Sequence, residues 1–92
     1  MTTLTQPQRE ELRYSVREAL VIAKTVALDA EMVSRRVERS RMLDFEFATA
    51  DVEDALAVIV GLGQATAVPA TLGATVYYQA TAAGVLAHER GA

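Results

Sequence analysis

Residues 75–84 read Thr-Val-Tyr-Tyr-Gln-Ala-Thr-Ala-Ala-Gly, and this stretch decides the fold of the chain. Its first six residues are rich in β-branched and aromatic side chains, which predicts a strand. Thr81 follows as a good N-cap, so we expect a short last helix, Ala82–Glu89, with Val85 and Leu86 facing inward. A strand that runs directly into a helix is typical of an α+β domain.

A second β-rich segment, residues 64–68, precedes this strand, and the turn-forming residues 69–74 separate the two. Together they predict a β-hairpin. A helix is expected before the hairpin, with Thr49 or Asp51 as its N-cap and Gly63 in the C′ position after its end. Its buried stripe is predicted to consist of Val52, Leu56, Ile59 and Val60.

Two further helices are expected in the first forty residues. The first begins near Thr5, which can cap it, and Pro7, which suits a first turn. Its apolar residues recur at spacings of three and four and form one broad face: Leu12, Val16, Ala19, Leu20, Ile22, Ala23, Val26 and Ala27. A shorter helix is expected over residues 30–38, with Asp29 as its N-cap.

Apolar and acidic residues alternate in the segment after the second helix, Leu43-Asp-Phe-Glu-Phe47. A period of two predicts a short strand or extended segment with one apolar face. We expect Leu43, Phe45 and Phe47 to fill the core from this segment.

The order helix, helix, short strand, helix, hairpin, helix resembles the winged-helix fold of PadR-like and MarR-like regulators. Residues 52–63 resemble their third helix, and residues 75–84 resemble their second wing strand, which reads Tyr-x-x-Thr-x-x-Gly. The resemblance implies a small α+β winged-helix domain over residues 1–92, with three helices, a short β-hairpin wing and a short C-terminal helix. Residues 1–6 are expected to be flexible. In the family the first short strand lies between the first two helices, whereas the extended candidate here follows the second.

Charge disfavours the DNA contact that this resemblance implies. No lysine or arginine occurs between Arg41 and Arg90, and that interval holds six carboxylates: Asp44, Glu46, Asp51, Glu53, Asp54 and Glu89. In the family the third helix enters the major groove and the wing touches the DNA backbone. Neutralisation of phosphates supplies most non-specific affinity for DNA. We therefore expect a non-catalytic regulatory module that acts through protein–protein contacts, as a homodimer or bound to another protein.

Two sets of residues are candidate contacts. The candidate protein interface consists of Tyr14, Val21, Asp54, Ala57, Val58 and Gly61. Tyr14 and Val21 fall outside the apolar stripe of the first helix, which predicts a dimer contact there. The alternative is a DNA-binding regulator that uses an arginine patch on the second helix, supported by Arg13, Arg17 and Lys24. The patch consists of Arg35, Arg36, Arg39 and Arg41. A small-ligand sensor within a dimer is a third possibility, for which no residue argues.

Other chemistry finds no support in the sequence. The chain has no cysteine for a disulfide or a thiolate metal site, and we expect no catalytic residue, cofactor or metal. His88 is the one histidine, and we expect it to be exposed or stabilised by the helix dipole. The unbroken apolar run, residues 55–63, is far shorter than the ~20 residues that span a membrane. The first residues do not read as a signal peptide, so we expect a cytoplasmic location.

Overall fold

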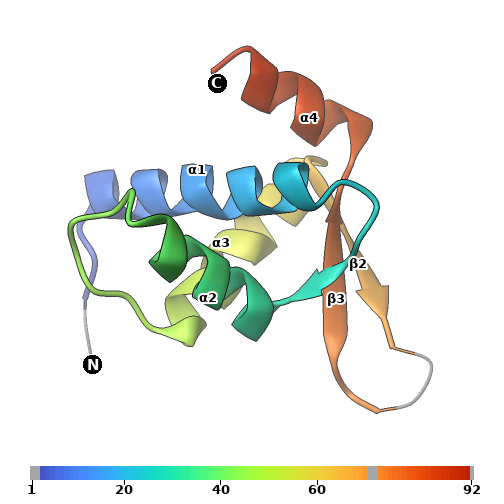
Figure 1. Cartoon of the computed structure of the whole chain (residues 1–92), viewed down its shortest axis with the longest axis horizontal. Coiled ribbons are helices and arrows are strands. Elements are labelled where there is room, and N and C mark those ends of the chain that lie inside the picture. The colour runs from blue at the N-terminus through green and yellow to red at the C-terminus, as the bar shows by residue number, and fades with distance from the viewer. Residues whose placement is uncertain (1–2, 71–72, 92) are drawn as a thin grey trace.

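Helix α1 (Gln6–Ala23) lies across α2 and α3 in this computed structural model, which describes residues 3–70 and 73–91 (Figure 1). Thr5 caps the helix as predicted: its side-chain oxygen accepts from the Gln8 N–H at 3.3 Å, and the Gln8 side chain accepts from the Thr5 N–H at 2.9 Å. Leu4 is buried in the core. The expected flexibility of residues 1–6 stays a prediction, and residues 1–2 lie outside the described part.

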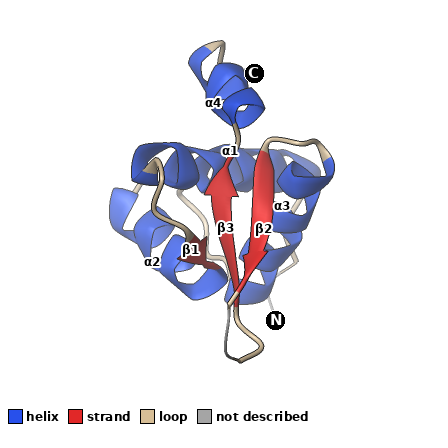
Figure 2. Cartoon of the chain, turned by 90° about the vertical axis from the view of Figure 1, so that its right-hand side faces the viewer, coloured by secondary structure: helices blue, strands red, loops and turns tan. Residues whose placement is uncertain are grey.

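The described residues form four helices and a three-stranded antiparallel sheet. After α1 come β1 (Leu28–Asp29), α2 (Ala30–Ser40), α3 (Thr49–Gly61), β2 (Ala65–Pro69), β3 (Val76–Ala80) and α4 (Ala82–Glu89). Figure 2 shows the sheet in front of α1, α2 and α3, with α4 beyond one end of the strands. The predicted α+β fold class is confirmed, and the arrangement is consistent with a small winged-helix-like domain. Of the predicted turn, residues 71–72 lie outside the described residues.

Residues 43–47 were expected to form a short strand or an extended segment, and they do not form a strand. This segment is a loop, and the short strand of the sheet is β1 (Leu28–Asp29), which pairs with Tyr77 and Tyr78 of β3. The alternation nevertheless describes burial correctly, since the three apolar side chains pack against the core while Asp44 and Glu46 are exposed. Any extended segment alternates its side chains, whether or not a neighbouring strand is there to pair with it. The short strand of the sheet thus lies between α1 and α2, and not after the second helix as expected.

The core lies between α1, α2, α3 and the sheet, and it is built from aliphatic residues. Its most completely buried large side chains are Leu12, Leu20, Leu28, Leu56, Val16, Val33 and Val52. Each such side chain stabilises the fold by roughly 1.5–3 kcal/mol relative to an exposed one. Ile22, Val26 and Leu86 were expected to face inward and are exposed instead. Ile22 lies beside the hollow between α1 and α2, Val26 follows the end of α1, and α4 approaches the body through Gly84 rather than Leu86.

A corner at Gly63 and Gln64 joins the end of α3 to the start of α4. Gly63 has φ +75°, the left-handed conformation that the predicted C′ glycine supplies at low cost. The Thr81 hydroxyl donates to the Gly63 carbonyl at 2.6 Å, and the Thr81 N–H donates to the Gln64 carbonyl at 3.1 Å. Thr81 also caps α4, because its hydroxyl oxygen accepts from the Gly84 N–H at 3.1 Å. The Thr81 side chain thus bonds the turn that follows α3 and also caps α4.

Gly84 is required by the same corner. A Cβ atom at this position would lie 1.9 Å from the Gln64 carbonyl oxygen, a backbone atom whose place is set by the Thr81 hydrogen bond. Only a residue without a side chain lets the first turn of α4 come this close. Packing therefore accounts for the threonine and the glycine of the Tyr-x-x-Thr-x-x-Gly pattern.

Replacing Gly84 with alanine is expected to lower the free energy of unfolding by about 2 kcal/mol or more, since overpacking typically costs roughly 1–3 kcal/mol. Gly61→Ala is the matched control, because Gly61 is helical and no atom lies within 4 Å of the place that its Cβ would take. That control should leave stability unchanged or raise it by up to ~1 kcal/mol through helix propensity. Urea denaturation followed by circular dichroism measures both, and equal losses in the two variants would contradict the packing argument.

Candidate functional site

The outward face of α3 is exposed and carries no cation. Its exposed residues are Glu53, Asp54, Ala57, Val58 and Gly61, as the helical period predicts. The start of this helix differs from the prediction: Ala48 is the N-cap residue, and the Asp51 side chain accepts from the Ala48 N–H at 2.8 Å. Asp51 therefore satisfies a backbone donor from inside the first turn, and neither it nor Thr49 occupies the cap position.

A groove of about 480 Å³ runs between α1 and α3. Its apolar lining residues are Tyr14, Val58, Ile59 and Leu62, and its polar ones are Glu10, Arg13, Arg17 and Gln64. Tyr14, Val58 and Leu62 are 40%, 37% and 63% exposed, so the apolar strip is open to solvent. A smaller hollow of about 90 Å³ shares Arg13 and Val58 with this groove and continues it toward Leu4. We call the two together the α1–α3 groove.

The two walls of the α1–α3 groove carry opposite charges in its continuation toward Leu4. Arg9 and Arg13 line it from α1, and Asp51 and Asp54 line it from α3. The facing charges are not joined by any ion pair among the described residues. Asp51 also accepts from the Ala48 N–H, while Arg9, Arg13 and Asp54 are open to a molecule that lies in the groove.

The structure brings together only some of the predicted interface residues. Tyr14, Val58 and Asp54 line the α1–α3 groove, although they come from two helices far apart in the sequence. Ala57 and Gly61 lie on the exposed face of α3 but do not line the groove, and Val21 is half-buried. Leu62, the most exposed apolar residue of the groove, was not among the predicted residues. It follows the last residue of α3, where the helical period alone does not set its direction.

Helix α4 covers the side of α1 on which Tyr14 lies. The His88 and Tyr14 rings have centroids 4.9 Å apart, and His88 Nε2 lies 3.6 Å from a Glu18 carboxylate oxygen. The His88 side chain is only 15% exposed, so of the two expectations, an exposed imidazole and one stabilised by the helix dipole, the first is wrong; His88 lies in the last turn of α4, where the second applies. Tyr14 thus has a neighbour within its own chain outside the core stripe, and the dimer contact at Tyr14 and Val21 stays a prediction.

Arg17 is a structural residue, contrary to its place in the DNA-binding hypothesis. It is 6% exposed, and its guanidinium donates to the Gln64 side-chain oxygen at 3.1 Å. The guanidinium carbon also lies 5.6 Å from the centre of the Tyr14 ring, a distance at which a cation and an aromatic face attract each other. Because Gln64 is 47 residues away in the chain, no local pattern reveals this burial.

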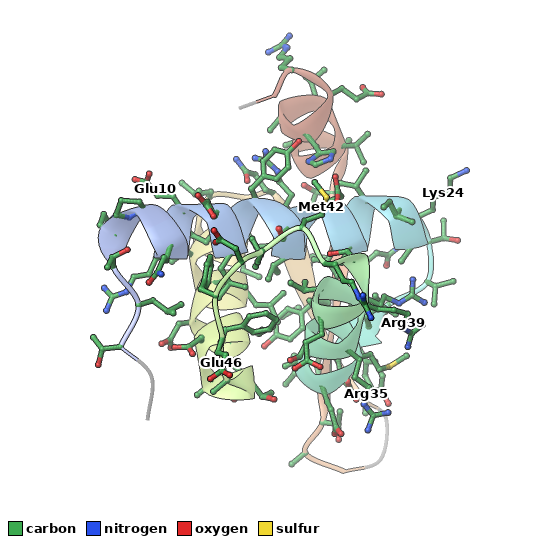
Figure 3. All side chains as sticks on the ribbon, turned by 60° about the vertical axis from the view of Figure 1, so that its left-hand side comes forward. Glu10, Lys24, Arg35, Arg39, Met42 and Glu46 are labelled. Atoms are coloured by element: carbon green, nitrogen blue, oxygen red, sulfur yellow. The ribbon has the colours of Figure 1, made fainter. Side chains whose placement is uncertain are left out.

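The α2 arginines are exposed but face away from α3. Arg35 pairs with Glu31 at 2.6 Å on the surface of α2. Arg36 and Arg39 border a separate hollow of about 240 Å³ between α1 and α2. Figure 3 shows Arg35 and Arg39 pointing away from α3, on the same side of the molecule as Lys24. Arg41, in the left-handed conformation, ends the helix. This patch and the outward face of α3 are therefore separate surfaces.

Comparisons with known proteins assign no family to the chain. No protein-family model matches the sequence, and no curated protein is significantly similar to it. Within residues 3–70 and 73–91, no group of three histidine or acidic side chains is placed to hold a metal ion. No helix in the same residues is long and apolar enough to cross a membrane. The α1–α3 groove combines exposed apolar side chains with charged side chains from both helices.

The Arg17–Gln64 contact is expected to couple α1 to the corner by about 1–2 kcal/mol, since a part-buried hydrogen bond to a charged group contributes more than an exposed one. A double-mutant cycle with Arg17→Met and Gln64→Met, read by urea denaturation, measures this coupling. The exposed pair of Glu31 and Arg35 is the control and should couple by no more than ~0.5 kcal/mol. Equal couplings in the two cycles would show that burial adds nothing to the Arg17 contact.

Proposed function

We propose that this chain is a non-catalytic protein-interaction module of the winged-helix type, and that its α1–α3 groove binds an amphipathic helix of a protein partner. The observation that carries the proposal is the open apolar strip of Tyr14, Val58 and Leu62, continued between walls of opposite charge. A helix laid in a groove contributes apolar side chains at positions i, i+3 or i+4, and i+7. Two helices with an apolar strip between them form a groove suited to such a stripe.

The charged walls define the chemistry of the partner. Arg9 and Arg13 favour acidic side chains along the edge of the partner helix that lies against α1. Asp51 and Asp54 favour basic side chains along its other edge. The apolar strip supplies affinity through burial, while the charged edges select the partner and its direction.

The positions of the acidic residues on α3 and of the arginines on α2 support a protein partner over DNA. The outward face of α3 holds Glu53 and Asp54 where a major-groove helix needs donors to phosphates and bases. The cationic residues that are exposed on α2 lie on a different side of the molecule. A duplex laid against α3 would meet carboxylates and small apolar groups.

Helical peptides selected from a display library against the whole chain are expected to bind in the α1–α3 groove. Leu62→Glu should weaken the selected peptides by at least ~10-fold, because a carboxylate would be buried beneath the apolar stripe. Ile22→Glu is the matched control: Ile22 is 65% exposed and Leu62 is 63% exposed, but Ile22 lies beside the α1–α2 hollow. Calorimetric titration measures both affinities. Peptides that respond to Ile22→Glu and not to Leu62→Glu would contradict the proposal.

Duplex DNA is expected to bind weakly, with a dissociation constant above ~100 μM even at ~50 mM salt, where electrostatic contacts are strongest. Fluorescence anisotropy with a labelled random duplex measures this. Tighter binding that falls with added salt and is lost in an Arg36→Ala, Arg39→Ala variant would favour the arginine-patch hypothesis instead.

A further inference from the structure

The outer edge of strand β2 presents backbone hydrogen-bonding groups to solvent. The strand order is β1-β3-β2, so β2 has one strand neighbour, and no other described strand lies along its outer edge (Figure 2). Its first residue, Ala65, is buried, while residues 66–69 are exposed. Unpaired edges of this kind are templates for pairing with another chain.

The register of the hairpin shows which groups point outward. The Ala70 N–H donates to the Thr75 carbonyl at 3.0 Å, and hydrogen-bonded pairs recur at every second position of an antiparallel ladder. Val68 opposite Tyr77 and Thr66 opposite Gln79 therefore turn their backbone groups toward β3. Ala67, between them, turns its N–H and C=O toward solvent.

The edge lacks the charges that usually protect an exposed strand. No charged residue occurs from Ala55 to Ala87, an interval that contains the whole hairpin. Natural edge strands are commonly guarded by lysine, by bulges or by inward-pointing charges. Pro69 is the one protective residue of this kind in β2. Like Ala67 it turns its backbone groups away from β3, so its missing N–H removes no hydrogen bond from the hairpin. The central residues of the edge stay available for pairing.

We propose that β2 pairs antiparallel with β2 of a second copy of the chain, about a two-fold axis at Ala67. A strand that pairs with its own copy antiparallel forms an isologous contact, in which each copy offers the same groups. The two Ala67 residues exchange N–H···O=C bonds, and Thr66 lies opposite Val68 of the second copy. Ala65 then lies opposite Pro69 of the second copy, and because Ala65 is buried and Pro69 has no N–H, the backbone bonds between the copies are those of Ala67.

Charge and side-chain size are compatible with this contact. Each chain has a net charge of −3, but none of that charge lies on the hairpin, so the edges meet without like-charge repulsion. Ala67 is small, and Thr66 and Val68 form a β-branched cross-strand pair of a favourable kind. The pairing joins the two three-stranded sheets into one. It uses a surface outside the α1–α3 groove and goes beyond the proposed function.

Disulfide trapping tests the register, because the chain contains no cysteine of its own. In the proposed register the two Ala67 Cα atoms lie ~5.5 Å apart, within the range that a disulfide spans. The two Thr66 residues are diagonal neighbours at ~7–8 Å or more. Under mild oxidant, Ala67→Cys should form covalent dimers at least ~10-fold faster than Thr66→Cys, at a rate that rises with protein concentration. Ala57→Cys, on the exposed face of α3, is the control for random collision.

Equal trapping rates for the three cysteine variants, or fastest trapping at Ala57, would overturn the proposal. Sedimentation equilibrium gives a second test without a cross-link. The unmodified chain should show a concentration-dependent dimer, and Val68→Lys, which adds an edge charge at a half-exposed position, should remain monomeric. A chain that stays monomeric up to ~1 mM, or a dimer that Val68→Lys leaves intact, would also overturn it. Neither experiment involves the groove, so their failure is distinct from a failure of helix binding.

Discussion

The hydrogen bonds around Gln64 hold the structure together. Its N–H donates to Ile59 at the end of α3, its carbonyl accepts from Thr81 before α4, and its side chain accepts from Arg17 in the middle of α1. One residue therefore fixes where α3 ends, where the hairpin begins and where α4 returns to the body. These contacts are part-buried, and an unsatisfied polar group at such a place costs about 1–3 kcal/mol. The Gln64 end of the α1–α3 groove has its shape because this corner is fixed.

The distribution of charge gives the small domain distinct surfaces. Lys24, Arg35 and Arg39 lie on one side, and Glu10 and Glu46 on another (Figure 3). The hairpin carries no charge at all. A groove with charged walls and an uncharged strand edge select different kinds of contact, since the first depends on side-chain pairing and the second on backbone hydrogen bonds. The proposed partner helix and the proposed second copy would therefore occupy the molecule without competing for the same residues.

Local signals predicted much of the fold. The Thr5 cap, the apolar spacing of α1 and the positive-φ glycine at residue 63 all arise from interactions within a few residues, and the structure confirms them. The two-residue strand β1 was not predictable in this way, because it exists only where Tyr77 and Tyr78 of β3 lie beside it. The burial of Arg17 escaped prediction for the same reason, as its partner is distant in the chain.

The candidate site shows the same division. The helical period of α3 correctly predicted that Asp54 and Val58 are exposed, because the spacing of residues within one helix determines which of them share a face. The position of Tyr14 across from Val58 depends on how α1 packs on α3. The contact between the tilted rings of His88 and Tyr14 depends on the corner at Gln64. Contacts between residues of different helices depend on tertiary packing, and the apolar spacing within one helix does not predict them.

The contacts of Thr81 and Gly84 with Gln64 fix the position of α4 but leave its outer side free to change. The approach of this helix is limited by a backbone carbonyl and a missing side chain, while Leu86 on its outer side remains exposed. Substitutions at Leu86 can therefore change what α4 presents to solvent while its angle to α1 is retained. New surface chemistry can therefore be acquired at Leu86 with little effect on the packing of α4.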